Sequence, residues 1–480
     1  MIKYNLKTYR ITERNLILFL IFFVLSYDTS YSKNNNVCYV SSSEGNDYND
    51  GSVLYPFRTF SRAVASGADT VFIKSGDIFY ENIEIDGQVV NKYGDGPKPL
   101  LYGIKIPQKG RWENGIIVNG KWIKKKSNIW RIDLSADDRY FKGFKTGGAS
   151  FLNNIGAIIN IATDDLNNCR KVPEYKDLSD NYDFWQPCPV KNTGNATIHD
   201  FDFLYLFLNE NPNEFDFGLS VATYAVSIKN GEVSNLNLKY WEFGIIVKDN
   251  VKISNCDIDG IGGNIQRGVK SWVLFGNGIE LWVTPPKRYN CIIENCNISR
   301  TFDCGATIQG RHYKKKLRAE DIIFRNNTFR NCCQSFEEFL RGPTEDDLYY
   351  NCFFENNLSI DAGINTGFRY FDNRYKRCHF LSNSNLRNTH MIIRNNIAIN
   401  GNYLCAGPYD NLYRQAIWQC NTCHIKRGQD LLGNYVGTKD VIKVPTEKGR
   451  FNSIEEATDS AISNYRYLTG DTTTHFIIIE

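Results

Sequence analysis

The sequence predicts an all-β solenoid of stacked parallel strands, because one short motif occurs five times between Val251 and Asn400. Each copy holds apolar residues, an Asn-containing polar pair and a strand-like run, and the copies lie at Ile253, Ile293, Phe324, Phe354 and Ile393. Successive copies are 40, 31, 30 and 39 residues apart. A unit this short cannot bury its own hydrophobic face, so the units must stack into one continuous core.

Within each copy, apolar and polar residues alternate as in a strand, and the run is too short for a helix. Nearly identical strands pair most simply in parallel, so we expect residues 253, 293, 324, 354 and 393 to form one ladder. The Asn residues then fall at matched turns. Asn tolerates the left-handed region and bonds to nearby backbone, so a column of Asn suits such a corner.

Three further stretches precede the repeats: Tyr39 to Gly51 with its Gly-Asn-Asp-Tyr-Asn-Asp-Gly run, Pro56 to Ala63, and Asp69 to Gly76. Together with the repeats they resemble the secreted right-handed parallel β-helix proteins of the pectin-lyase-like superfamily. The resemblance covers roughly 37–87 and 221–410 and matches 90–220 only loosely. It implies an all-β, right-handed parallel β-helix.

Residues 1–32 are predicted to form a secretory signal peptide. Four basic residues precede an apolar run of ten from Leu16 to Leu25, and small residues follow at Ser30 and Ser32. This order is typical of an export signal, and the run is too short to span a bilayer. We therefore expect cleavage after about Ser32, a secreted or periplasmic protein, and no stable membrane insertion.

Four more segments follow the signal. Residues 37–101 hold the first coils, with a helix between Pro56 and Gly67 as the N-terminal cap. Residues 102–219 lose the repeat and carry separated strand-like runs, which predicts an antiparallel β insertion. Residues 220–430 hold the main repeats. Residues 431–480 form a tail, in which a capped helix beginning near Asn452 covers the other end of the solenoid.

The composition indicates which classes of binding partner to expect. The 480-residue chain has a net charge of only +3, which indicates neither a nucleic-acid surface nor a polybasic membrane patch. Aromatic residues make up 14% of the chain, a share that suits stacking on sugars as well as filling a β core. We expect a monomer with a carbohydrate partner and with no cofactor or metal.

The chain has 14 cysteines. Those in or beside the repeats, Cys256, Cys296, Cys332 and Cys352, are expected to be buried thiols. Cys169 and Cys188 flank a loop-like stretch and are the best candidates for a disulfide. Cys420 and Cys423 have CxxC spacing without a second pair, so a disulfide or two free thiols is expected there rather than a metal site.

Candidate chemistry lies where three consecutive coils depart from the repeat. Their apolar alternation turns Ile279, Ala306 and Phe336 inward, which leaves two outward columns. One column holds Glu280, Thr307 and Glu337, and the other holds Trp282, Gln309 and Phe339. Arg369 of the next coil is expected to continue the first column, and Asp303 lies at the turn into the middle strand.

The acids of this surface suit glycoside hydrolysis. Residues two strands apart, such as Glu280 and Glu337, would lie about 9.6 Å from each other, and Asp303 could be nearer to either. Hydrolysis uses carboxyl pairs about 5 Å apart for retention or about 6.5–9.5 Å apart for inversion. We expect Glu337, beside phenylalanines, to be the proton donor and Asp303 to stay ionised as base or nucleophile. Glu280 would position the sugar or take the second role, with Trp282, Gln309 and Arg369 binding the substrate.

Three motifs around these residues, Asn277 to Glu280, Thr301 to Asp303 with Gln309, and Ser335 to Glu337, resemble a glycosidase-type branch of the superfamily. The sequence leaves three functions open: a glycoside hydrolase, a polysaccharide lyase of pectate-lyase type, or a non-catalytic glycan-binding surface protein. The solenoid scaffold hosts all three. Outward carboxylates are also common on a solvated surface that has no function. The same holds for a charged loop such as the basic run 311–318. The three-Asp pattern and Gly-His-Gly of polygalacturonase-type hydrolases are not present.

Overall fold

The computed structural model describes residues 36–106, 111–113, 116–118, 120–134, 144–146, 149–151, 155–186, 203–220, 223–266, 273–284, 289–312, 314–315, 317–341, 348–370, 377–382, 390–407, 416–427, 429, 431–434 and 453–479. The predicted signal segment, 1–32, and Cys188 lie outside this set. In the described part of the chain, no helix combines the length and apolarity that a membrane crossing requires.

Three long parallel sheets build the solenoid. Sheet A has ten strands, in spatial order β1 (Val37–Val40), β2 (Thr70–Lys74), β5 (Val89–Tyr93), β20 (Gly231–Ser234), β23 (Val251–Ser254), β28 (Cys291–Glu294), β31 (Arg318–Arg325), β34 (Leu348–Glu355), β37 (Ile392–Arg394) and β40 (Ile417–Gln419). Sheet B has ten strands, β3 (Ile78–Phe79), β6 (Leu100–Tyr102), β21 (Asn237–Lys239), β24 (Asp257–Ile261), β29 (Asn297–Thr301), β32 (Thr328–Arg330), β35 (Leu358–Ile360), β38 (Ile397–Ile399), β41 (Thr422–Lys426) and β43 (His475–Ile479). Sheet C has nine strands, β4 (Ile83–Asp86), β19 (Tyr224–Lys229), β22 (Phe243–Val247), β27 (Ile279–Trp282), β30 (Cys304–Arg311), β33 (Gln334–Arg341), β36 (Cys378–Ser382), β39 (Tyr403–Gly407) and β42 (Leu432–Asn434). Each complete coil contributes one strand to each sheet, whereas β1 adds a strand to sheet A alone and β43 adds one to sheet B alone.

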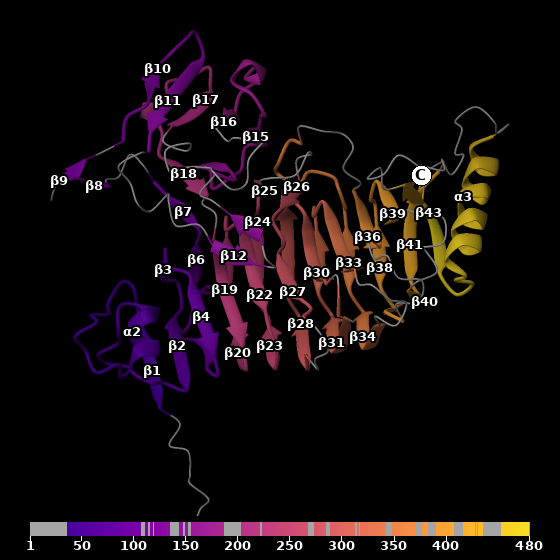
Figure 1. Ribbon diagram of the computed structural model, residues 1–480, viewed down its shortest axis with the longest axis horizontal. Coiled ribbons are helices and arrows are strands. Elements are labelled where there is room, and N and C mark those ends of the chain that lie inside the picture. The colour runs from indigo at the N-terminus through magenta and orange to yellow at the C-terminus, as the bar shows by residue number, and fades with distance from the viewer. Residues whose placement is uncertain are drawn as a thin grey trace, which may run out of the picture. The chain divides into compact units, whose positions relative to one another are not determined.

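The predicted ladder is confirmed residue by residue. Within sheet A, Ile253 pairs with Ile293, Ile293 with Phe324, Phe324 with Phe354, and Phe354 with Ile393, all in parallel. Figure 1 shows strands of successive coils side by side from β1 to β43. The chain is therefore a parallel β-helix, with one apolar column of each sheet turned into a shared core.

Asn occupies the corners as its chemistry predicts. The first Asn of each motif has a positive φ between 53° and 56°: Asn255, Asn295, Asn326, Asn356 and Asn395. The residue after it turns inward. Asn327, Asn357, Asn396 and Asn421 are buried there, and each of the first three donates from Nδ2 to Oδ1 of the next at 3.0–3.1 Å. Because every amide bonds to its neighbour, this column satisfies polar groups that the turns would otherwise bury unpaired.

Helices cover both ends of the core. Helix α2 (Phe60–Ala65) is shorter than the predicted 56–67 helix, because Phe57 already pairs with Val40 in a β-bridge and Thr59 caps the helix N-terminus. Helix α3 (Ile454–Thr469) is longer than predicted and is capped by Ser453. Its Tyr465 is fully buried and packs against Trp418 of the last coils. The tail also adds β43 to sheet B, which its lack of a repeat did not predict.

A β-rich insertion separates β6 from β19 in sequence. The coils nevertheless stack without a gap, because Val226 of β19 pairs directly with Ile83 of β4. Most strand pairs of the insertion are antiparallel, as predicted, although β15 and β16 are parallel. Its elements are β7 (Ile104–Lys105), β8 (Arg111–Glu113), β9 (Ile116–Val118), β10 (Ile123–Lys124), β11 (Ile129–Asp133), β12 (Phe144–Thr146), β13 (Ala149–Phe151), β14 (Ile158–Asn160), β15 (Arg170–Lys171), η3 (Tyr175–Asp177), β16 (Asp183–Trp185), β17 (Phe203–Phe207), η5 (Pro212–Glu214) and β18 (Phe217–Ser220). A further antiparallel pair, β25 (Asn264–Gln266) and β26 (Val273–Phe275), lies between β24 and β27.

The insertion shares a second hydrophobic core with the coils. Phe184, Leu204 and Phe217 of the insertion belong to the same cluster as Phe302 and Phe368 of the coils. Burying these apolar groups together holds the insertion against the β-helix. Since Phe302 directly precedes Asp303, this second core adjoins the predicted site.

The cysteines of the described residues are all free thiols. Those predicted to pack as small apolar groups, Cys256, Cys296, Cys332 and Cys352, are buried in the solenoid core. The expected disulfide of Cys169 is not formed. Cys169 is a buried free thiol in the second core, where burial raises its pKa to about 12.

Candidate active site

The two predicted columns exist in sheet C in the predicted register. Glu280 pairs with Thr307, and Thr307 with Glu337, across β27, β30 and β33. Trp282, Gln309 and Phe339 form the second column on the same strands. The alternation that predicts them follows from the inward column, whose members Ile279, Ala306 and Phe336 all lie in the solenoid core.

The first column is recessed rather than surface-exposed as predicted. Only 1% of Glu280 and 6% of Glu337 is exposed, and Thr307 is fully buried. These side chains point away from the solenoid core into a polar layer of neighbours that includes Asn277 and Gln334. Carboxyl groups in such a setting meet a lower dielectric than surface groups, so their mutual interactions are stronger.

Glu337 is held by two donors and lies beside a thiol. Its Oε2 accepts hydrogen bonds from Gln309 Nε2 at 3.0 Å and from Thr307 Oγ1 at 3.3 Å. The Cys304 thiol is 3.4 Å away, but its one hydrogen is nearer to Gln334 Oε1, at 2.8 Å. Donors aimed at one carboxyl oxygen favour the ionised form of that group. Glu337 Oε2 thus accepts from neutral donors on the neighbouring strand β30.

Asp303 has the opposite environment. Burial raises the pKa of its carboxyl well above the usual range, and the negative charges of Glu337 and then Glu280 raise it further. Among described residues, its carboxyl meets one side-chain donor, the distant thiol of Cys304 at 3.7 Å. This direction runs against the expectation that Asp303 stays ionised. That expectation left out the burial of Asp303 and the charges of Glu337 and Glu280.

Cys304 links the two acids, and sequence reasoning did not assign it. Its thiol contacts Asp303 Oδ1 at 3.7 Å and Glu337 Oε2 at 3.4 Å, so the two oxygens lie within about 7 Å of each other. This limit admits the spacing of either retaining or inverting hydrolysis. Burial, followed by the charges of Asp303 and Glu337, raises the thiol pKa well above its usual range, so Cys304 remains a neutral donor.

Asn277 and Gln334 complete the polar layer and were also missed as site residues. Asn277 Nδ2 donates to Glu280 Oε2 at 2.8 Å, while its Oδ1 accepts from the backbone N–H of Cys304 at 3.1 Å. Gln334 Oε1 accepts from the Cys304 thiol at 2.8 Å. Both residues are polar and buried. Gln334 begins β33 and Asn277 lies just before β27, and this position on or next to a strand of the site was the signal available in the sequence.

Glu338 shows how narrowly the register decides a role. It pairs with Ile308 and Ser382, and therefore belongs to the inward column next to Glu337. Its carboxyl is 2% exposed and accepts from Ser382 Oγ at 2.6 Å. A small cavity lined by Phe336, Phe380 and Trp418 lies beside it inside the coil. Glu337 therefore lies on the outer side of sheet C, and Glu338 lies on its inner side.

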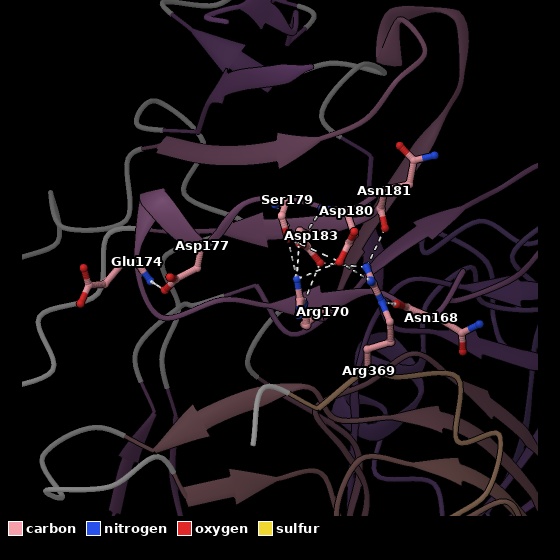
Figure 2. Close-up of polar contacts among 9 residues, drawn as sticks. All are labelled: Asn168, Arg170, Glu174, Asp177, Ser179, Asp180, Asn181, Asp183 and Arg369. Carbon is pink, nitrogen blue, oxygen red and sulfur yellow. Dashed lines mark hydrogen bonds and ion pairs between the residues drawn. The ribbon is translucent and has the colours of Figure 1, made fainter. Parts of the chain in front are cut away.

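Arg369 does not continue the predicted column. Sheet C places Leu381 beside Glu337, because β36 rather than the turn after β35 supplies the next strand. Arg369 instead joins the insertion, where Nη2 lies 2.8 Å from Asp183 Oδ1 and 2.6 Å from the carbonyl oxygen of Asn181. Figure 2 shows Arg369 and Arg170 converging on the same acidic pair, Asp180 and Asp183.

The carboxyl of Asp183 is the centre of this ion cluster and is fully buried. Burial acts to raise its pKa, but the hydrogen bonds from Arg170 and from the backbone N–H groups of Asp180 and Ser179 outweigh burial and lower it. The cluster is therefore a structural connection between the insertion and the turn that contains Arg369.

The second column remains partly open. Trp282, Gln309 and Phe339 are each intermediate in exposure. The Arg341 guanidinium lies 4.9 Å from the centre of the Phe339 ring. Two aromatic rings one strand apart on either side of Gln309 form a platform beside the recessed acids, and such rings stack on apolar faces while leaving polar groups free to bond.

Within the described ranges, no three His, Cys, Asp or Glu side chains are grouped so as to hold a metal ion.

The chain has no match among protein-family models or among curated proteins. Among solved structures it resembles "The complex structure of XylC with xylose" at 12% identity and a TM-score of 0.40, over 81% of this chain and 69% of that one. It resembles a structure titled "Glycoside hydrolase" at 10% identity and a TM-score of 0.37, over 83% and 95% of the two chains. It also resembles a GH136 lacto-N-biosidase from Eubacterium ramulus at 11% identity and a TM-score of 0.34, over 88% and 70%. At TM-scores below 0.5, none of these likenesses assigns a function to this chain.

Proposed function

We propose that the protein is an exported glycoside hydrolase that cleaves a polysaccharide or oligosaccharide at the recessed acids of sheet C. The single observation that carries this proposal is the contrast between Asp303, whose pKa is raised, and Glu337, which accepts hydrogen bonds from Gln309 and Thr307. Two neighbouring carboxyls whose surroundings push their protonation apart are the arrangement that acid–base cleavage of a glycosidic bond requires.

In this proposal Asp303 is the proton donor and Glu337 is the ionised partner, the reverse of the roles expected from the sequence. Asp303 protonates the glycosidic oxygen as the bond between that oxygen and the anomeric carbon breaks. Glu337 either takes a proton from the water that attacks the anomeric carbon or attacks that carbon itself. In the second case water later cleaves the glycosyl ester, and Asp303 takes up the proton of that water.

Glu280 and the second column have supporting roles. Glu280, held by Asn277, lies two strands from Glu337, about 9.6 Å away, and is placed to bind sugar hydroxyls or to tune the charge of Asp303. Trp282 and Phe339 supply faces for a sugar ring on either side of Gln309. Residues 1–32 would direct export, so the substrate would be met outside the cytoplasm.

The test is turnover by the purified protein on a panel of defined glycans, followed by the variants Asp303→Asn and Glu337→Gln. Each variant keeps the shape of the side chain and removes the titrating group, so each should lower kcat about a hundredfold or more. Glu294→Gln is the matched control, because Glu294 is a half-buried acid on sheet A that pairs with Arg325. It should retain full activity.

The reaction products distinguish a hydrolase from a lyase and from a glycan-binding protein. Hydrolysis yields saturated reducing ends, a lyase yields unsaturated ends that absorb ultraviolet light, and a glycan-binding protein yields neither. Full activity in both Asp303→Asn and Glu337→Gln would move the active site away from these acids.

A further inference from the structure

Three planar groups are stacked beside Asp303. The rings of Phe302 and Tyr370 are parallel within 10° with centres 5.0 Å apart, and the Tyr370 hydroxyl donates to the Phe302 carbonyl oxygen at 3.1 Å. The Arg377 guanidinium lies 4.6 Å from the centre of the Tyr370 ring. The stack begins at the residue that precedes Asp303, so Arg377 is tied to the site through two aromatic rings.

The register of sheet C sets the distance between Arg377 and Asp303. Cys304 pairs with Gln334, and Gln334 with Cys378. Asp303, Cys333 and Arg377 immediately precede these three residues, so Arg377 lies two strands from Asp303, about 9.6 Å along the solenoid. The Cys333 thiol lies between them in this register. Burial raises the pKa of Cys333 to about 12, with Asp303 acting to raise it and Arg377 to lower it.

Arg377 differs from the arginines that pair with carboxylates and, like Arg62 and Arg341, faces an aromatic ring. Arg170, Arg300, Arg325, Arg369 and Arg394 all form ion pairs with carboxylates. Arg377 is half-buried, and in the described part of the chain its guanidinium meets an aromatic face and no carboxylate. A guanidinium stacked on a ring is fixed in orientation, while the N–H donors around its rim remain able to bind a planar anion through two parallel bonds.

We propose that Arg377 binds an anionic substituent of the saccharide, a carboxylate or a sulfate ester, at a subsite two strands from Asp303. This inference rests on the proposed function, because it places the anion on a glycan that also reaches the acids. A substrate anion brought to a site containing Asp303, Glu337 and Glu280 needs a compensating cation. Arg377 supplies that cation about 9.6 Å from Asp303 along the solenoid.

The experiment measures binding in the Asp303→Asn protein, in which turnover is suppressed, by calorimetry. The probes are a glucuronate-containing tetrasaccharide and its carboxyl-reduced form, and a sulfated tetrasaccharide and its desulfated form. We expect one acidic probe to bind at least about tenfold more tightly than its neutral counterpart, and Arg377→Gln to remove that difference. Arg377→Lys should restore it only in part, because an ammonium group keeps the charge and loses the two parallel bonds.

Arg330→Gln is the matched control. Arg330 is exposed on β32 of sheet B, so removing its charge tests for a nonspecific electrostatic effect. Binding of the acidic probe should be unchanged in this variant, and circular dichroism should show all variants folded. Which acidic probe binds decides between a carboxylate and a sulfate ester.

Two outcomes overturn the inference and are distinguishable from failure of the hydrolase proposal. Equal binding of acidic and neutral probes, with neutral glycans hydrolysed by the wild type, would remove Arg377 from substrate recognition and leave the hydrolase standing. An acidic preference that survives Arg377→Gln would assign the anion to another residue. An acidic preference lost in Arg377→Gln, without turnover of any glycan by the wild type, would support the binding role and overturn hydrolysis.

Discussion

Nη2 of Arg369 lies 2.8 Å from Oδ1 of Asp183, and this ion pair joins a turn of the β-helix to the inserted sheet. Asp183 is fully buried while Arg369 is about one-third exposed. The neighbouring backbone is joined as well, because the N–H of Arg369 donates to the carbonyl oxygen of Cys169 at 3.0 Å. The next residue, Tyr370, stacks on Phe302, so the insertion and the wall of the candidate site are mechanically connected.

This connection predicts that Asp183→Asn destabilises the protein strongly. The substitution leaves Arg170 and Arg369 without their buried counter-charge, and breaking a buried pair typically costs about 3–5 kcal/mol. Arg369→Gln should cost less, since Arg170 still neutralises Asp183. Urea unfolding of both single variants and the double variant would measure the coupling.

The control for that experiment is Glu455→Gln, which removes the exposed pair between Glu455 and Arg427. An exposed pair contributes about 0–1 kcal/mol, so this variant should unfold nearly as the wild type does. An equal loss of stability in Glu455→Gln and Asp183→Asn would contradict the structural role of the cluster.

The pH dependence of turnover should reveal the proton donor. Asp303 must carry a proton to act, and its raised pKa keeps it protonated above the pH at which ordinary aspartates ionise. Activity should therefore persist as the pH rises beyond the usual Asp range and then fall as Asp303 loses its proton, while a separate acid limb reports protonation of Glu337. A pH series of kcat/KM would show both limbs.

Asp303→Asn provides the check on that assignment. The residual activity of this variant should lack the alkaline limb, since the amide does not titrate. If the alkaline limb keeps its position in Asp303→Asn, another group is the proton donor.

Trp282 should contribute to binding more than to folding. It is partly exposed on the second column, and Trp282→Ala removes a stacking face for a sugar ring, which should weaken glycan binding by about 1 kcal/mol or more. Tm should fall only slightly. Trp418→Ala is the matched control, because Trp418 is 8% exposed and packs in the core against Phe380 and Tyr465.

Trp418→Ala should lower the free energy of unfolding by about 3–5 kcal/mol without a specific effect on binding. A drop in Tm for Trp282→Ala as large as that for Trp418→Ala would show that Trp282 serves the fold.

His379 should make the protein sensitive to acid. Its ring is buried inside the coil beside Ser359, whose hydroxyl also contacts Ser335 Oγ at 2.6 Å, and burial lowers the pKa of His379 from 6.5 to about 3. Below pH 6.5 the unfolded chain binds this proton and the folded chain does not, so stability falls with pH until the folded pKa is reached.

At pH 5 this single group should cost about 2 kcal/mol of folding free energy. Thermal unfolding of the wild type and of His379→Gln between pH 7.5 and pH 5 would isolate the effect, because the variant lacks the titrating ring. Parallel loss of stability in both proteins would assign the acid sensitivity to other groups.

The motif itself predicts much of the solenoid. The alternation around Ile253 and Ile293 and the Asn at each corner together define strand, register and turn, because each depends on a side chain and its immediate neighbours. The same alternation places Glu280, Thr307 and Glu337 in one column and separates Glu337 from Glu338. These are consequences of a two-residue period that can be read from the chain.

The features that only the tertiary structure decided depend on contacts between residues that are distant in sequence. Arg369 follows the turn after β35 and binds Asp183 of the insertion, a contact across 186 positions that no local pattern encodes. The pKa of Asp303 is likewise shifted against the sequence-based expectation, because it responds to burial and to Glu337 and Glu280, whose charges come together only when β27, β30 and β33 stack. Periodicity along a strand is a local property and is determined by sequence, whereas electrostatic environment is a sum over neighbours and is determined by packing.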